Sequence, residues 1–311
     1  MSSRAVIDAA TSRLAGRAER DAPLGGLTTY RVGGPAALLL RVASDDDLRT
    51  LADVVAATGI DVLVVGKGSN LLVADVGFPG LAVVLGDAFA AIEVDGTEVE
   101  AGAAAALPVV ARRTVSAGLT GFEWAAGVPG SIGGAVRMNA GGHGSDMAAV
   151  LGGVRVVDLR SGEDGWVPAT ALHLGYRTST VAPHHLVVAA RLDLTPGDVE
   201  RGTAELAEIV AWRRANQPGG PNAGSVFTNP PGDSAGRLID GAGGKGLRRG
   251  TAAVSTKHAN FIQADDGGRA DDVRALMRDV QALVRAASGV ELHPETRLVG
   301  FDPDPRPEIE G

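Results

Sequence analysis

Two glycine-rich segments are the candidates for a ligand-binding site in this sequence. One is "VGKGSNLLV" at residues 65–73, and the other is "GVPGSIGGAVRMNAGGHG" at residues 127–144. Ordered glycine costs about 0.5–1 kcal/mol of backbone entropy relative to alanine, so such clusters indicate that bare backbone is needed. Successive backbone N–H groups can form a concave cradle for an anion such as a pyrophosphate.

A tight turn is the competing interpretation of each segment, and a lone glycine-rich turn fits it well. Neither segment has the P-loop spacing, and the dinucleotide-binding strand–turn–helix pattern is also absent. Taken together, the two segments favour the cradle, to which Ser69 and Asn70 add side-chain donors. Gly133 and Gly134 would let the chain pass close to a large planar ring.

Both helices and strands are predicted around these two segments. Apolar periodicity and end signals predict helices over residues 44–58, 105–117, 199–218 and 271–288, with helical spacing also in 1–16. Strands are predicted within 60–73, over 154–159, 184–194 and 259–263, as a hairpin over 92–101, and once within the loop-rich stretch 219–236. Strict βαβ alternation is absent, so the predicted fold class is α+β.

Composition is that of an ordinary globular protein and excludes several kinds of site. The 311 residues are 45% hydrophobic and 21% charged, and two or three domains are expected at this length. No cysteine is present, which excludes disulfides and thiolate chemistry, and we predict no metal site. The net charge of −8 argues against a nucleic-acid partner but allows a local basic pocket for a phosphate-bearing small molecule. Without a signal-like start or a long apolar run, the chain is expected to be cytoplasmic and away from membranes.

Seven motifs in a fixed order carry a resemblance to a known family. They are "RVGGPA" (31–36), "VGKGSNLLV" (65–73), "GVPGSIGGAVRMNAGGHG" (127–144), "GYRTS" (175–179), "AGSVFTNP" (223–230), "GLRRGTAAVSTKHANFI" (246–262) and "LHPETRLVG" (292–300). Each motif alone is weakly specific, but the ordered set extends over nearly the whole chain. It resembles the UDP-N-acetylenolpyruvoylglucosamine reductases, also called UDP-N-acetylmuramate dehydrogenases.

The resemblance implies a cytoplasmic flavoenzyme of bacterial cell-wall synthesis. In that family two α+β subdomains of the vanillyl-alcohol-oxidase (PCMH) type bind FAD non-covalently, and a third α+β domain binds the substrate. The corresponding ranges are residues 1–86, 87–197 and 198–311. NADPH reduces the flavin, which passes hydride to UDP-N-acetylglucosamine enolpyruvate and gives UDP-N-acetylmuramate. A monomer is expected.

Three residues match the family's catalytic groups. Hydride addition to an enolpyruvyl group builds negative charge on the neighbouring carbon and its carboxylate, so the site needs a cation and a proton donor. Arg177 in "GYRTS" matches the arginine that stabilises this intermediate, because a guanidinium binds a carboxylate through two hydrogen bonds. Ser225 in "AGSVF" matches the proton donor, although its local sequence does not make it acidic. Glu295 in "HPETR" matches the glutamate that acts with the arginine.

Binding residues follow from the same motifs. Those matched to FAD are Gly33, Gly34, Gly66, Lys67, Gly68, Ser69, Asn70, Gly127, Pro129, Gly130, Ser131, Gly133, Gly134, Asn139, Gly141 and Gly144. Those matched to the UDP-sugar substrate are Tyr176, Arg213, Arg214, Asn229, Lys257, His258 and Asn260.

Four positions depart from the family's pattern. Asn216 stands where lysine is common before "QP", so one diphosphate contact is either missing or replaced by Arg213 or Arg214. Thr228 replaces the lysine of "KNP", His143 replaces a tyrosine, and Lys67 replaces a small or amide residue. The short "TPGD" connection lacks the family's tyrosine-bearing insertion, which indicates the short-loop (type II) subclass.

Two other functions are the alternatives. An FAD-dependent sugar or alcohol oxidase of the same fold would share residues 31–144 but has no reason to carry "AGSVFTNP" and "HPETR". A non-catalytic flavin-binding protein would have no need of the three catalytic matches. The reductase is therefore the predicted function.

Overall fold

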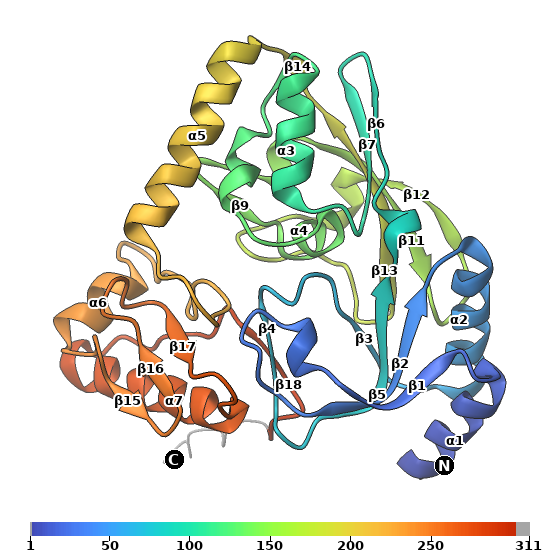
Figure 1. Cartoon of the computed structure of the whole chain (residues 1–311), viewed down its shortest axis with the longest axis horizontal. Helices are drawn as coiled ribbons and strands as arrows, with labels where there is room; N and C mark the ends of the chain where they lie inside the picture. Colours follow the sequence, from blue (N-terminus) through green and yellow to red (C-terminus); the bar gives the residue numbers. More distant parts are fainter. Residues whose placement is uncertain (1, 303–311) are drawn as a thin grey trace, which may run out of the picture.

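Residues 2–302 are described by the structure, a computed structural model in which three parts surround a central region (Figure 1). The first part is a four-stranded sheet of order β1-β2-β5-β3 with helices packed on it. Its elements are α1 (Ser3–Leu14), β1 (Ala18–Pro23), β2 (Pro35–Val42), α2 (Asp45–Thr58), β3 (Val62–Val64) and β5 (Phe78–Leu85). Strands β2, β5 and β3 are parallel, and β1 runs antiparallel to β2.

The second part, at the top of Figure 1, is an antiparallel five-stranded sheet of order β12-β11-β13-β7-β6. Its strands are β6 (Ile92–Asp95), β7 (Glu98–Gly102), β11 (Leu151–Asp158), β12 (Asp164–Pro168) and β13 (His185–Asp193), and its helices are α3 (Leu107–Ser116) and α4 (Ile132–Met138). Two short strand pairs join β8 (Leu119–Thr120) to β14 (Thr195–Pro196) and β9 (Gly141–Gly142) to β10 (Ser145–Asp146).

In the third part the last helix packs on a small antiparallel sheet of order β15-β16-β17, the short helix before the sheet packs on that last helix, and the first helix packs instead against α3 of the second part. Its elements are α5 (Val199–Asn216), α6 (Ala235–Gly241), β15 (Arg248–Arg249), β16 (Ala252–Val254), β17 (Ile262–Ala264) and α7 (Ala270–Ser288). The last strand, β18 (Arg297–Val299), then leaves this part and pairs in parallel with β4 (Leu71–Val73) of the first part. This pairing carries residues near the end of the chain back to the first glycine-rich loop.

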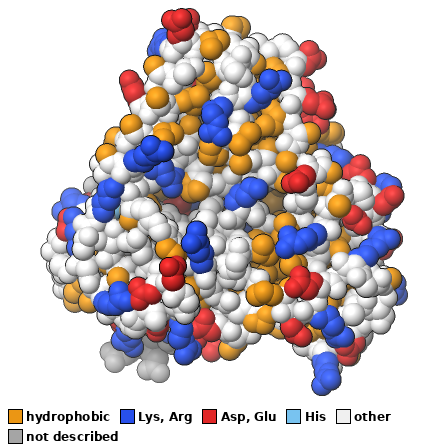
Figure 2. All heavy atoms as spheres, viewed as in Figure 1, with side chains coloured by type: hydrophobic (Ala, Val, Ile, Leu, Met, Phe, Trp, Pro, Cys, Tyr) orange, Lys and Arg blue, Asp and Glu red, His pale blue; other side chains and the backbone are white. Residues whose placement is uncertain are grey.

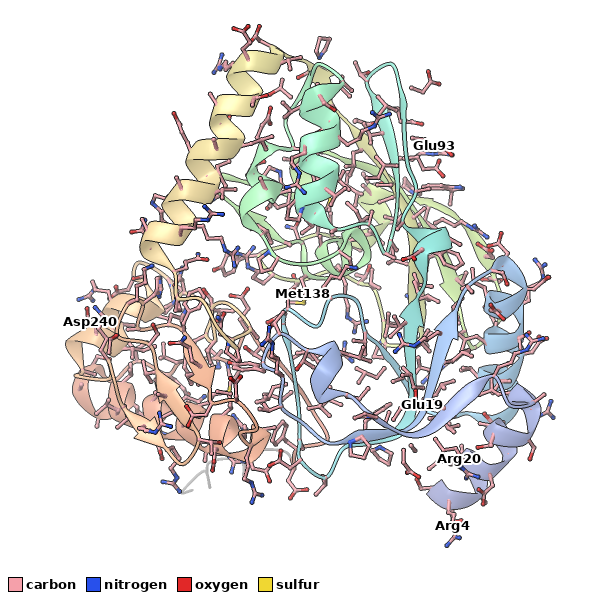
Figure 3. The ribbon with its side chains drawn as sticks, viewed as in Figure 1. Arg4, Glu19, Arg20, Glu93, Met138 and Asp240 are labelled. Carbon is pink, nitrogen blue, oxygen red and sulfur yellow. The ribbon has the colours of Figure 1, made fainter. Side chains whose placement is uncertain are left out.

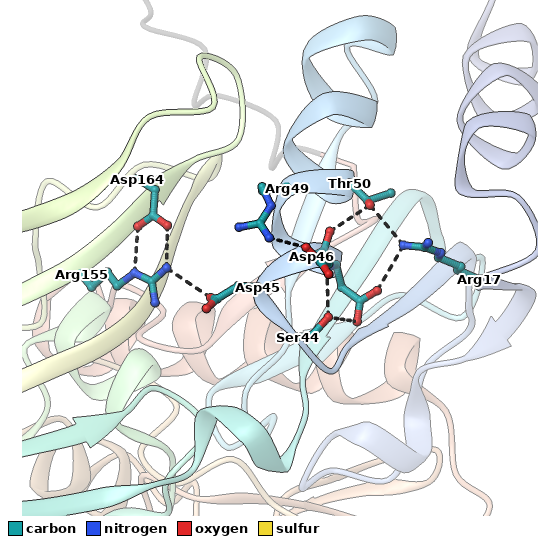
Figure 4. Close-up of polar contacts among 9 residues, drawn as sticks. Arg17, Ser44, Asp45, Asp46, Arg49, Thr50, Arg155 and Asp164 are labelled. Carbon is teal, nitrogen blue, oxygen red and sulfur yellow. Dashed lines mark hydrogen bonds and ion pairs between the residues drawn. The ribbon is translucent and has the colours of Figure 1, made fainter.

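The beginning of α2 shows why the first two parts stay in contact. Ser44 caps the helix by accepting a hydrogen bond from the backbone N–H of Asp47, and three aspartates occupy the first turn, where the helix dipole favours them. Arg155 of β11 reaches across to Asp45, with Nη2 3.2 Å from Oδ1, and also binds Asp164 through two nitrogens (Figure 4). One guanidinium thus links the helix start to the neighbouring sheet.

Each part has an apolar core, although the cores are not strictly separated. The core of the third part also contains Tyr30, Val32 and Leu72 from the first part. A core of the first part includes Leu186 and Val188 of β13. The division into residues 1–86, 87–197 and 198–311 stays a prediction. No helix within residues 2–302 is long and apolar enough to cross a membrane.

The predicted α+β class and all four predicted interior helices are confirmed, as is the hairpin at β6 and β7. The strand predicted at 259–263 forms later, at β17, because a turn closes between Phe261 and His258. The short strand predicted within 219–236 is wrong: the described residues show only an isolated bridge between Phe227 and Pro294. The Asn260 side chain takes both the N–H and the C=O of Phe227, so these groups do not extend a ladder.

Candidate active site

A cavity of about 510 Å³ lies where the three parts meet. Its walls come from residues 64–71 of the first part, from Arg177 and several residues within 127–143 of the second, and from several residues within 212–225 of the third. Glu295 and Arg297 line it from the returning end of the chain. Met138, which also lines the cavity, lies at the centre of the molecule in Figure 3, and a recess flanked by Lys and Arg side chains is visible there in Figure 2.

The first glycine-rich loop lines the cavity with all of its predicted residues, Gly66, Lys67, Gly68, Ser69 and Asn70. Gly68 has a φ of +61°, and a Cβ there would meet Leu27 O at 2.1 Å, so the backbone itself demands glycine. The Ser69 hydroxyl donates to Pro129 O at 2.9 Å, which ties this loop to the second glycine-rich segment.

The second glycine-rich segment holds the short helix α4, and its two adjacent glycines have different roles. A Cβ on Gly133 would meet the Cβ of Ala103 at 3.0 Å, so this glycine serves packing. Gly134 is exposed to the cavity, and a Cβ there would have only Ser131 Oγ within 4 Å, at 3.8 Å. Glycine inside a helix is destabilising, so its presence at position 134 needs a reason other than helix stability. The open space beside Gly134 indicates that the bare backbone leaves room for a ligand. Also on the cavity wall are Gly127, Pro129, Gly130, Ser131 and Gly141.

Arg177 reaches the cavity from a tight turn. Gly175 and Thr178 exchange two backbone hydrogen bonds of 3.1 Å, and Arg177 between them has a φ of +56°, unusual for a non-glycine residue. Its Nε donates to Glu295 Oε1 at 2.8 Å and its Nη2 to Gly141 O at 3.1 Å. A guanidinium has five N–H donors, so further donors stay available to an anionic ligand.

Glu295 is held at the cavity by long-range contacts. Its backbone N–H donates to Val226 O at 2.8 Å, and its C=O accepts from Asn70 Nδ2 at 3.1 Å. Burial raises the pKa of the Glu295 carboxyl, and the Arg177 guanidinium opposes that rise. Asn70 was predicted to bind FAD; in the structure it lines the cavity and positions Glu295.

Ser225 stands between this cavity and a second one of about 430 Å³. The second cavity is lined by the predicted substrate residues Asn229, Lys257, His258 and Asn260. Asn260 is buried, and its side chain holds the Phe227 backbone close to Ser225, with bonds of 3.0 and 2.8 Å. Burial and the Lys245 cation lower the pKa of His258.

Several predicted residues do not line either cavity. A Cβ on Gly33 or Gly34 would meet the backbone oxygen of Val73 or Asp75 at 2.6 or 2.2 Å, so strand packing accounts for these glycines. Asn139 is buried and donates to Gly175 O at 3.0 Å, which supports the turn that carries Arg177. The remaining residues outside both linings are Gly133, Gly144, Tyr176 and Arg214.

Sequence reasoning missed several residues that line the main cavity: Arg137, His143, Trp212, Gln217 and Arg297. Arg137 and His143 belong to the second glycine-rich segment, and Arg297 is two residues beyond Glu295. The period of two in an extended segment could have placed Arg297 on the same side as Glu295. Trp212 is half-exposed, and its ring meets that of His143 edge to face at 5.1 Å.

The lining chemistry fits a flavin nucleotide. Five cationic side chains and one carboxylate face this cavity among the described residues, although the whole chain carries a net charge of −8. Cations and backbone N–H groups suit a diphosphate, and the open wall at Gly134 suits a flat ring.

Comparisons with known proteins agree with this site. Residues 36–164 match an FAD-binding domain family, and residues 215–299 match the C-terminal domain of UDP-N-acetylenolpyruvoylglucosamine reductase. The reductase of Rubrobacter xylanophilus is 41% identical, over 94% of this chain and 99% of its own. The chain belongs to the UDP-N-acetylenolpyruvoylglucosamine reductase family. It is therefore an oxidoreductase with an FAD-binding domain, and the oxidase alternative has no support.

Other members of the reductase family show the same extent of similarity. The reductase of Acidiphilium cryptum is 44% identical, over 94% of this chain and 94% of its own. The crystal structure of the reductase from Thermus caldophilus covers 91% of this chain and 99% of its own, with a TM-score of 0.80 and 37% identity. The similarity thus includes the FAD-binding and C-terminal domains together.

Proposed function

We propose that this reductase converts UDP-N-acetylglucosamine enolpyruvate to UDP-N-acetylmuramate with NADPH as electron donor and non-covalently bound FAD. The observation that carries the proposal is that Arg177, Ser225 and Glu295, distant in the sequence, share one cavity with both glycine-rich segments. The chemistry that FAD would supply when bound is the relay of hydride from NADPH to the enolpyruvyl double bond. The protein's own residues bind the cofactor and the substrate, orient them and protonate the intermediate.

Arg177 binds the carboxylate of the enolpyruvyl group and stabilises the negative charge that hydride addition builds on it. Glu295 orients Arg177 through the 2.8 Å ion pair to Nε, leaving Nη donors for the substrate. The Asn139 and Gly141 carbonyls accept from the two Nη nitrogens at 3.5 and 3.1 Å and fix the plane of the guanidinium.

Ser225 donates the proton that completes the reduction, to the carbon next to the one that receives hydride. Its place on both cavities puts it between the cofactor side and the substrate side. A free serine is a poor acid. Neighbouring cations must therefore stabilise the Ser225 alkoxide that forms when the proton leaves, or a water must reprotonate it.

The UDP portion of the substrate binds in the second cavity and reaches the adjoining wall of the main cavity at Arg213. Arg213 lines the main cavity and is half-buried, whereas Arg214 is exposed and only its backbone C=O accepts from Lys257. Asn216 is engaged locally, because its Nδ2 donates to Trp212 O at 2.8 Å. We therefore assign the diphosphate contact of the missing lysine to Arg213.

The domain division, oligomeric state and subclass of this protein follow those of the family. Residues 1–86 and 87–197 form the two FAD-binding subdomains, residues 198–311 form the substrate domain, and the protein acts as a monomer. The connection between the end of β13 at Asp193 and the start of α5 at Val199 is short, which supports the short-loop subclass.

Ser225→Ala tests the function by separating the two half-reactions. A group that only protonates the intermediate takes no part in flavin reduction, so NADPH should bleach the flavin band at the wild-type rate in stopped-flow absorbance. Reoxidation by the enolpyruvyl sugar should slow by about 10²–10⁴-fold, typical of one lost general acid. Ser225→Cys should recover part of the loss.

Equal slowing of both half-reactions would make Ser225 a structural residue, and unchanged reoxidation would assign the proton to another group. The purified protein should also be yellow and release FAD on heat or acid denaturation, since no cysteine is available for a thioether. A colourless protein that FAD cannot reconstitute would refute the proposed function.

A further inference from the structure

Two arginines outside the catalytic set, Arg137 and Arg297, line the main cavity from different parts of the chain. Arg137 belongs to the last turn of α4, and Arg297 begins β18. Both are half-buried. The reaction steps assigned above use neither of them.

Neither guanidinium has an acidic partner within residues 2–302, in contrast to Arg177 with Glu295. Arg137 Nη1 donates only a long bond, 3.4 Å, to Ala182 O. Burial, together with the cation of Arg297, lowers the pKa of Arg137 to about 10. Burial also lowers the pKa of Arg297. The two half-buried cations repel each other and have lost part of their hydration. An anion bound in the cavity beside both of them would offset these costs.

The reacting centre lies next to this pair. Residues two apart in an extended segment point to the same side, so Arg297 shares the cavity face with Glu295 while Thr296 between them is buried. Asn70 holds both ends of the segment from Glu295 to Arg297. Its side-chain Nδ2 donates to Glu295 O at 3.1 Å, and its backbone C=O accepts from Arg297 N at 3.1 Å. A cofactor ring that reacts beside Glu295 and Arg177 would therefore also lie beside Arg297.

We propose that Arg137 and Arg297 act together as a cationic pair that stabilises the reduced, anionic ring of bound FAD and so raises its midpoint potential. This inference rests on the proposed function. Two electrons and one proton added to the neutral oxidised ring leave one negative charge, which a nearby cation favours over the oxidised state. The pair positions no substrate; it acts on the cofactor's redox equilibrium.

A phosphate is the other anion that such a pair could bind, and the structure favours the ring. A phosphate already has donors elsewhere on the cavity wall, in the backbone of residues 66–69 and the exposed ammonium of Lys67, whereas Asn70 at the end of this loop is engaged by Glu295 and Arg297. Arg297 instead adjoins Glu295 and, through it, Arg177.

The test measures the midpoint potential of bound FAD in Arg297→Gln and Arg137→Gln by dye equilibration with a chemical reductant, which needs neither NADPH nor the sugar. Each variant should lower the equilibrium constant for two-electron reduction at least tenfold, about 30 mV toward more negative potential. Affinity for oxidised FAD should change much less. Arg191→Gln, which removes the same charge from outside the cavity, is the matched control and should leave the potential unchanged.

Potentials in both variants that match the wild type would overturn the inference while leaving the proposed function intact. A large loss of affinity for oxidised FAD at unchanged potential would also overturn it, and would assign the pair to a phosphate. If Arg297→Gln fails to fold, Arg297→Lys keeps the charge and should retain most of the potential, whereas Arg137→Gln should not. A wild-type protein that binds no FAD would refute the proposed function and the inference together.

Discussion

Arg177 shows how a single side chain was placed at a local cost. Its φ of +56° at the third position of a four-residue turn favours glycine, and a non-glycine residue there costs of order 1–3 kcal/mol. The turn nevertheless places the Arg177 guanidinium against Glu295, and the Asn139 side chain stabilises the turn by donating to Gly175 O. A strained backbone at this residue is consistent with selection for chemistry over stability.

Replacing Arg177 by lysine should remove most of the activity although the charge is kept. A point cation cannot bind a carboxylate through two parallel hydrogen bonds, so we expect kcat to fall tenfold or more, at least about 1.4 kcal/mol of transition-state stabilisation. Steady-state kinetics with an unchanged flavin spectrum checks this. Turnover within about twofold of the wild type would show that Arg177 does not stabilise the intermediate.

Glu295 should make stability depend on pH in a defined direction. Burial raises its pKa above 4.5, so the folded protein binds this proton more tightly than the unfolded chain does. The contribution of Glu295 to stability is therefore complete below about pH 4.5 and is lost as the pH rises through the folded pKa. Denaturant unfolding of the apoprotein across this range should show a decline relative to Glu295→Gln, and parallel curves would contradict the prediction.

At the scale of an element, α4 contains a matched pair of glycines. Gly134→Ala should stabilise the apoprotein by about 0.5–1 kcal/mol, because alanine is the better helix former and its Cβ has open space. The same methyl group should weaken FAD binding, since it extends into the cavity. Gly133→Ala should instead destabilise the apoprotein, because its Cβ meets Ala103 at 3.0 Å. Thermal unfolding and FAD titration separate the two effects, and equal behaviour of the variants would contradict this assignment.

The start of α7 is capped from another part of the chain. Asp75, just after β4, accepts hydrogen bonds from the backbone N–H groups of Ala270 and Asp271 at 2.9 and 3.3 Å. It also pairs with Arg269 Nε at 3.2 Å. This carboxylate fastens the third part to the first, in addition to the pairing of β18 with β4.

Asp75→Ala should lower the free energy of unfolding by about 1–2 kcal/mol, the usual value of a helix N-cap in a favourable setting. Asp266→Ala, which removes an exposed carboxylate close to the same helix, is the control and should change stability little. Chemical denaturation measures both. A loss no larger than that of the control would show that the contact contributes nothing.

For the whole molecule, charge is distributed unevenly in a way that labelling can detect. The chain has three lysines, Lys67, Lys245 and Lys257, and all of them line the two cavities while the net charge is −8. FAD should protect Lys67 from acetylation by several-fold, and UDP added to the holoenzyme should protect Lys245 and Lys257. Mass spectrometry of labelled peptides reads each site. If Lys67 is acetylated at the same rate with and without FAD, it does not belong to the cofactor site.

Helices with strong local signals could be predicted from the amino-acid sequence. Helices α2 and α7 lie where apolar periodicity, first-turn acids and a closing glycine predicted them, because these forces act within a few residues. The ordered motifs also predicted the family and the three residues that share the main cavity.

The contacts of each motif residue could be read only from the folded chain. Arg177 and Glu295 are 118 residues apart, and only the pairing of β18 with β4 brings the end of the chain to the cavity. The same long-range packing gave Gly133 and Gly134 different surroundings and set Arg297 beside Glu295. It also brought the Asn70 and Asn260 side chains against the backbone that they hold in place. Such roles depend on which backbone or side chain arrives from elsewhere in the chain, and residue type and spacing do not contain that information.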